Sequence, residues 1–111
     1  MTHGKPVLTG NLGSVIRRGL RTLMHEHLAA PWPEAVERGS EYGGIDPVMV
    51  DADIYGFATR ARSLRPDERD RLHATVRELE AVLVQLPEDA QPYFERLIRM
   101  ARLTFNVRSG I

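Results

Sequence analysis

Cysteine is absent from the 111 residues of the chain. Disulfide bonds, thiolate metal sites and thiol nucleophiles are therefore excluded, and the composition is typical of a protein in a reducing compartment. No apolar run approaches the roughly 18 residues that a membrane-spanning helix requires. Residues 1–20 also lack the continuous apolar segment of a signal peptide. We therefore expect a cytoplasmic protein without a membrane partner.

Strand signals are missing as well, because neither polar–apolar alternation nor a hairpin turn occurs in the sequence. Apolar residues with a helical period occur in several separate stretches. A chain of this length buries roughly 65% of its unfolded surface, which allows one core without metal or disulfide bonds. We therefore predict an all-α fold, a small bundle of about four helices. The helical domain covers residues 11–106, between a flexible N-terminus at 1–10 and a tail at 107–111.

The first predicted helix runs from Asn11 or Ser14 to Leu28. Its apolar positions follow a 3.6-residue period and are Leu12, Val15, Ile16, Leu20, Leu23 and His27. Gly19 lies within this helix, and a close packing contact would explain its small size. Prolines and polar residues then interrupt the period, so residues 30–45 are predicted to form a connector.

The second and third helices have recognisable beginnings. Asp46 is a good N-cap and Pro47 suits the first helical position, so the second helix is predicted to run to about Ser63. Pro66 suits the first position of the third helix. The apolar seam of that helix consists of Leu72, Val76, Leu79, Leu83 and Leu86.

The last helix follows Pro87, with Asp89 as the predicted cap and Pro92 in the first turn. Only short links separate the second, third and fourth helices, and short links favour antiparallel neighbours. These three helices are therefore predicted to pack up-down-up. We expect the first helix either to dock across them or to exchange with another molecule.

The segment DADIYG, residues 51–56, partly matches a calcium-binding EF-hand loop. Asp51, Asp53 and Gly56 occupy its first, third and sixth positions. Arg62 stands at the twelfth position, where the loop needs a bidentate glutamate, and the helical period continues through the segment. We therefore interpret the two aspartates as polar helix residues, and Gly56 as a site of close approach by a neighbouring helix.

Other site chemistry is equally sparse. His25 and His27 are two residues apart, so they point about 200° away from each other on a helix and do not match a zinc-protease motif. No phosphate-binding loop with its lysine and no nucleophile beside a base occurs. We expect no catalytic residue, cofactor or metal. For an enzyme or metal protein, the least implausible groups are His25, His27, Asp51 and Asp53.

Arginine supplies the chain's clearest charge pattern, although the formal net charge is zero. Arginines recur on the outer faces of the first and last helices, and such stripes either contact phosphates or lie in solvent. They are Arg17, Arg18, Arg21, Arg96, Arg99 and Arg102. A nucleic-acid-binding regulator that uses these residues is our alternative hypothesis for function.

Apolar residues beyond the predicted core stripes suggest a contact surface. Helices that are apolar on more than one side need a second covering layer, supplied by the first helix or by another molecule. The candidate residues are Trp32, Val48, Met49, Tyr55, Ala81 and Val84. Our leading hypothesis is a helical protein–protein interaction module, an adaptor, regulator or inhibitor-like partner that self-associates as a homo-oligomer.

Overall fold

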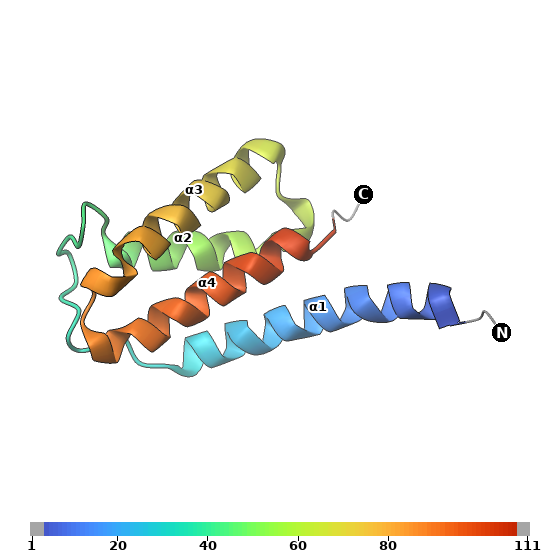
Figure 1. Ribbon diagram of the computed structural model, residues 1–111, viewed down its shortest axis with the longest axis horizontal. Helices are drawn as coiled ribbons and strands as arrows, with labels where there is room; N and C mark the ends of the chain where they lie inside the picture. The colour runs from blue at the N-terminus through green and yellow to red at the C-terminus, as the bar shows by residue number, and fades with distance from the viewer. Residues whose placement is uncertain (1–3, 109–111) are drawn as a thin grey trace.

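The computed structural model describes residues 4–108, and these residues form an all-α bundle (Figure 1). Its four α-helices are α1 (Gly4–Ala29), α2 (Pro47–Thr59), α3 (Pro66–Val82) and α4 (Gln91–Asn106). Short 3-10 turns η1 (Ala61–Ser63), η2 (Leu83–Gln85) and η3 (Glu88–Ala90) join the last three helices. Across residues 4–108 there is no strand, only an isolated bridge between Tyr42 and Ile45. The predicted fold class is confirmed.

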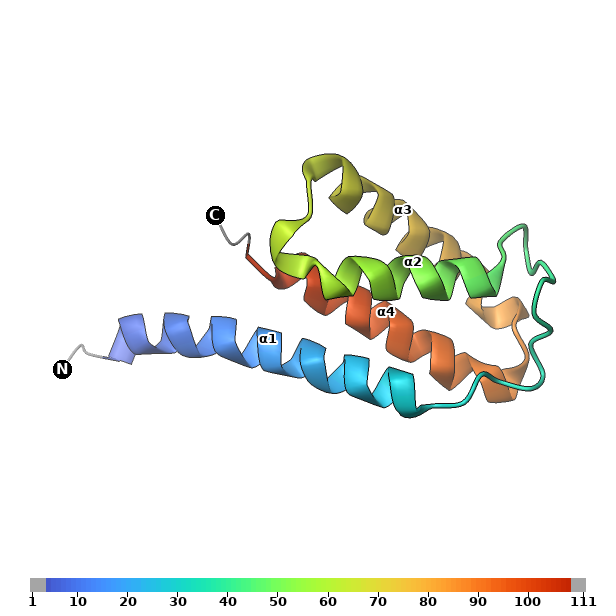
Figure 2. The ribbon, with the colours of Figure 1, turned by 180° about the vertical axis from the view of Figure 1, so that it is seen from behind.

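The helices α2, α3 and α4 run up-down-up, as predicted, and α1 lies antiparallel beside α4 (Figures 1 and 2). The central helix is α4, which contacts the other three. The first helix therefore docks on the bundle within one chain. It is much longer than its neighbour: at 1.5 Å per residue, the 26 residues of α1 span about 39 Å and the 16 residues of α4 about 24 Å.

Two of the predicted helix beginnings are found, each with a clear cause. The Asp46 carboxylate accepts a hydrogen bond from the backbone N–H of Val48 at 2.9 Å, and Pro47 follows at the first helical position. Pro66 opens α3, where the Glu68 carboxylate accepts a hydrogen bond from the N–H of Arg65 at 3.0 Å. These contacts satisfy N–H groups that a helix start leaves without intrahelical partners.

Other predicted boundaries were wrong. Helix α1 begins at Gly4 instead of Asn11 or Ser14, so residues 4–10 of the predicted flexible N-terminus are helical. The proline at position 6 is compatible with this start, because the first turn has no intrahelical use for its missing N–H. Asp89 lies inside η3 and does not cap α4. Residues 1–3 and 109–111, the rest of the predicted N-terminus and most of the tail, lie outside the described part.

The core lies between α2, α3 and α4, and one face of α1 covers its side. The largest fully buried apolar side chains come from all three of the short helices: Ile54, Leu72, Leu79, Phe94, Leu97 and Met100. The predicted seam of α3 is buried except at Leu83, which is half-buried. From α1, Leu20 and His27 are buried, while Ile16 and Leu23 pack against the core.

Three glycines differ in how much space surrounds them for a side chain. A Cβ on Gly19 would make an ordinary contact, 3.5 Å from Leu103 Cδ1, which agrees with the packing predicted there. Gly43 has a φ of +58°, and a Cβ on it would overlap Val82, so this connector position requires glycine. The close approach predicted at Gly56 is wrong, because no atom lies within 4 Å of a Cβ built there.

Candidate functional site

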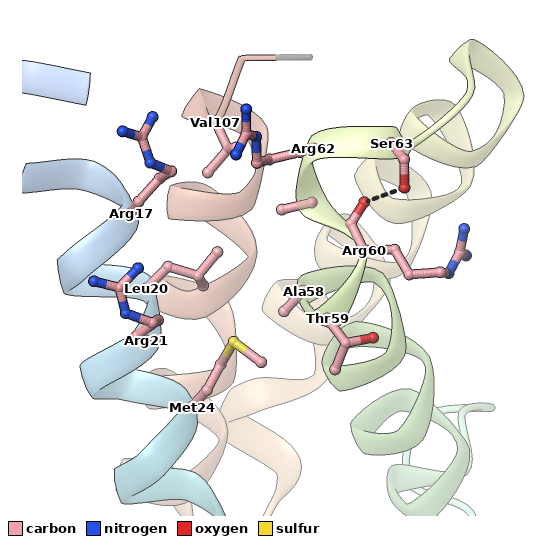
Figure 3. Close-up of a pocket in the computed structure, with 11 residues that line it drawn as sticks. Arg17, Leu20, Arg21, Met24, Ala58, Thr59, Arg60, Arg62, Ser63 and Val107 are labelled. Atoms are coloured by element: carbon pink, nitrogen blue, oxygen red, sulfur yellow. Dashed lines mark hydrogen bonds between the residues drawn. The ribbon is translucent and has the colours of Figure 1, made fainter. Parts of the chain in front are cut away.

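An arginine-rimmed groove lies between α1 and the junction of α2 with η1 (Figure 3). Its volume is about 300 Å³. We call it the arginine groove, and its lining residues are Arg17, Leu20, Arg21, Met24, Ala58, Thr59, Arg60, Ala61, Arg62, Ser63 and Val107. Antiparallel packing of α1 against α4 brings the α1 arginines beside the end of α2, although these segments are far apart in sequence.

Three cations of the arginine groove have no anionic partner among the described side chains. Of the ion pairs formed within residues 12–108, none involves Arg17, Arg21 or Arg62. Arg62 reaches across the groove toward Arg17 (Figure 3). Arg60 differs, because its guanidinium points away from the groove and pairs with Glu68 at 2.8 Å. The Arg60 hydrogen bonds, followed by the N–H of Arg65, lower the pKa of Glu68 to about 2.

The floor of the arginine groove is apolar. Leu20, Ala58 and Val107 are buried there, and Leu20 and Met24 point into the groove from α1 (Figure 3). No carboxylate lines it. The hydroxyls of Thr59 and Ser63 donate to backbone carbonyls of their own helical turns. The site therefore combines an uncompensated positive rim with an aliphatic floor.

The predicted arginine stripes are not one surface. Arg18 and Arg99 are exposed without a described ion pair. Arg102 pairs with Glu80 of α3, and Arg96 packs on the Tyr93 ring with its guanidinium carbon 5.3 Å from the ring centre. The arginine groove is lined by Arg60 and Arg62 together with Arg17 and Arg21 of α1, and by none of the α4 arginines. Sequence reasoning missed Arg60 and Arg62, since neither belongs to a helical stripe.

A second feature is a polar cluster formed by His27, Asp51 and Tyr93, which come from α1, α2 and α4. Asp51 Oδ1 lies 2.6 Å from His27 Nε2, and the Tyr93 hydroxyl donates to Asp51 Oδ2 at 2.5 Å. His27 is only 5% exposed. Burial is the main cause of a raised Tyr93 pKa, and the hydrogen bond to Asp51 adds to it.

The geometry gives the polar cluster a structural role. Because Asp51 is the acceptor at Nε2, this ring nitrogen of His27 carries the hydrogen. The other nitrogen, Nδ1, is buried with no hydrogen-bond partner, so neither nitrogen is open to a molecule in solvent. The cluster ties the C-terminal end of α1 to two helices of the bundle. Of the four groups that we named for an enzyme or metal protein, His27 and Asp51 meet, while His25 and Asp53 are exposed.

Trp32, Val48 and Tyr55 are three of the predicted partner-binding residues. Together with the polar cluster they line a groove of about 530 Å³. Trp32 Nε1 donates to the carbonyl of Val36 at 2.7 Å, and its ring meets Phe94 edge-on with centroids 5.9 Å apart. Trp32 thus covers the end of the core. Tyr55 stacks on His27 with ring centroids 6.0 Å apart.

The other predicted partner-binding residues are exposed and scattered. Met49 lies on α2 and Ala81 near the end of α3, while Val84 lies in the adjoining turn η2 and is 81% exposed. Leu12 and Val15, which we assigned to the apolar stripe of the first helix, are 61% and 56% exposed. The bundle therefore covers only part of the predicted stripe, and Leu12 and Val15 form exposed apolar surface.

Comparisons with known proteins give no indication of function, so a proposed function has to rest on these geometric features. The chain matches no protein-family model, and no curated protein or solved structure is significantly similar to it. None of the helices in the described part is long and apolar enough to cross a membrane. Among the described side chains, those of residues 12–108, there is no group of three placed to hold a metal ion.

Proposed function

We propose that the protein is a helical interaction module that self-associates through the N-terminal half of α1. The observation that supports this most directly is the apolar stripe of α1. It packs on the bundle at Ile16, Leu20 and Leu23 and continues into solvent at Leu12 and Val15. We call residues 4–15 the free half of α1 and residues 16–29 the packed half.

The length of α1 favours a partner for its N-terminal turns. Its N-terminal turns extend past the end of α4, and no other described element lies beside them in either view (Figures 1 and 2). Helical segments of about a dozen residues are marginally stable in water without tertiary contacts. A second apolar surface against Leu12 and Val15 would supply those contacts and would bury apolar area at roughly 25 cal/mol per Å².

Charge favours a second copy of the chain as that partner. Residues 6–16 contain no charged side chain, whereas charged residues make up 27% of the whole sequence. Two copies of this segment would meet without like-charge repulsion. A twofold pairing would place the same patch on both subunits, which is the commonest form of closed homodimer.

Sedimentation equilibrium of the wild-type chain and of Leu12→Glu tests the proposal. The wild type should show a concentration-dependent mass above 12.5 kDa, the mass of one chain. The variant should remain at that mass, because burial of an unpaired carboxylate is costly. Its circular dichroism at low concentration should show that the bundle remains folded.

Val84→Glu is the matched control, because Val84 is an exposed apolar residue in the turn η2, outside α1. This variant should associate like the wild type. Loss of association in Val84→Glu alone would move the contact to the end of α3. A wild type that stays at 12.5 kDa at every concentration would contradict self-association, and a different protein would then be sought as the partner of the free half.

A further inference from the structure

We infer that the arginine groove binds a small amphiphilic anion, a phosphate or carboxylate head group on an apolar body. The head group would lie at the guanidinium groups of Arg17, Arg21 and Arg62, and the body would lie on the floor formed by Leu20, Met24 and Ala58. This site is separate from the proposed association surface at Leu12 and Val15, so either proposal can fail alone.

The electrostatics of the rim support an anionic ligand. Three guanidinium groups line one small groove without a carboxylate partner among the described residues. Like charges in one place repel each other, and an anion that bridges them relieves that repulsion. Guanidinium groups also match phosphate and carboxylate oxygens with paired hydrogen bonds. Arg60 contributes less, because Glu68 already neutralises it.

The floor and the size of the groove favour a small ligand over a nucleic acid. A volume of about 300 Å³ is at the lower end for small-molecule sites. Aliphatic side chains form the floor, and no aromatic ring lines it for a base to stack on. The positive rim does not continue along α4, because Arg102 pairs with Glu80 and Arg96 packs on Tyr93.

Calorimetric titration of the full chain with butyl, hexyl and octyl phosphate tests the two halves of the site together. Affinity should rise roughly two- to fourfold for each added methylene group, because each is buried on the floor. Inorganic phosphate and octanol, which each supply one half of the ligand, should bind far more weakly. Equal affinity for inorganic phosphate and octyl phosphate would overturn the inference.

Arg62→Gln and Arg17→Gln test the head-group position. Each should weaken octyl phosphate binding roughly tenfold or more, because each removes a charged hydrogen bond. Neither residue has a described ion pair, so the fold should persist in circular dichroism. Arg18→Gln is the matched control, since Arg18 is exposed on the same helix and does not line the groove.

Two results would overturn the proposal. An equal loss of binding in Arg18→Gln and Arg62→Gln would show diffuse charge attraction without a defined site. Tight binding of a single strand or duplex at ~50 mM salt, displaced steeply by added salt and lost in Arg62→Gln, would show a nucleic-acid surface. If neither result is seen, titration with alkyl carboxylates of matched chain length distinguishes a phosphate preference from a carboxylate preference.

Discussion

The two halves of α1 share one apolar period but have different surroundings. In the packed half, Leu20 is buried against the bundle and His27 joins Asp51 and Tyr93. In the free half, Leu12 and Val15 have the same helical spacing and remain exposed. An amphipathic stripe thus shows that a helix has a face to bury, and the neighbouring elements decide how much of it one chain covers.

Truncation of one leucine in each half should give the largest contrast. Leu20→Ala removes a buried side chain and should lower the free energy of unfolding by about 2–5 kcal/mol. Leu12→Ala should change it by less than about 0.5 kcal/mol when the protein is dilute. Urea denaturation at low concentration measures both, and similar losses in the two variants would contradict the division of α1.

The polar cluster should account for the next largest effect. Asp51→Asn removes the charge from the acceptor shared by His27 and Tyr93 and should cost roughly 1–3 kcal/mol. Asp53→Asn is the control, because Asp53 is exposed two positions along the same helix. Thermal unfolding of the two variants compares them. Equal stability would mean that the cluster does not anchor the packed half.

Lowering the pH should reduce the folding stability of the bundle by a smaller amount, because it protonates the Glu68 carboxylate. Glu68 has a pKa of about 2 in the folded protein, against an ordinary value of 4.5. A depressed pKa contributes stability above the unfolded value, and this contribution is lost as pH falls from 4.5 to about 2. Glu68→Gln should flatten the stability profile in this window. An unchanged acid slope would contradict the role assigned to the Arg60–Glu68 pair.

The smallest expected change in stability is at Gly56 of α2, where there is open space for a side chain. Gly56→Ala should raise the free energy of unfolding by roughly 0.5–1 kcal/mol, because alanine suits a helix interior and space is available. Gly43→Ala should destabilise, since its positive φ and the overlap with Val82 both disfavour a side chain. Chemical denaturation checks the signs. A destabilising Gly56→Ala would mean that another molecule covers this face.

The helices of the bundle were predictable because their signals are local. Asp46 caps α2 and Pro66 opens α3 in the way that their sequence positions indicate. The beginning of α1 was missed because residues 4–10 have no apolar period. The cap predicted at Asp89 was wrong because a 3-10 turn there precedes α4.

The candidate sites depend on contacts that one sequence does not encode locally. His27 and Asp51 are 24 residues apart, and Asp51 and Tyr93 are 42 apart. The sequence analysis named His27 and Asp51 as candidate polar groups because of their residue types, but only the packing of the helices brings them together with Tyr93. Likewise, Arg62 follows no stripe, and the docking of α1 on α4 places it opposite Arg17.

Hydrogen exchange at the backbone amides of residues 4–15 tests the central claim most directly. If two copies pair through the free half of α1, these amides should be protected at high protein concentration and lose protection on dilution. They should also be unprotected at every concentration in Leu12→Glu, while the packed half stays protected. Protection of residues 4–15 that is independent of concentration and unchanged in Leu12→Glu would contradict the account.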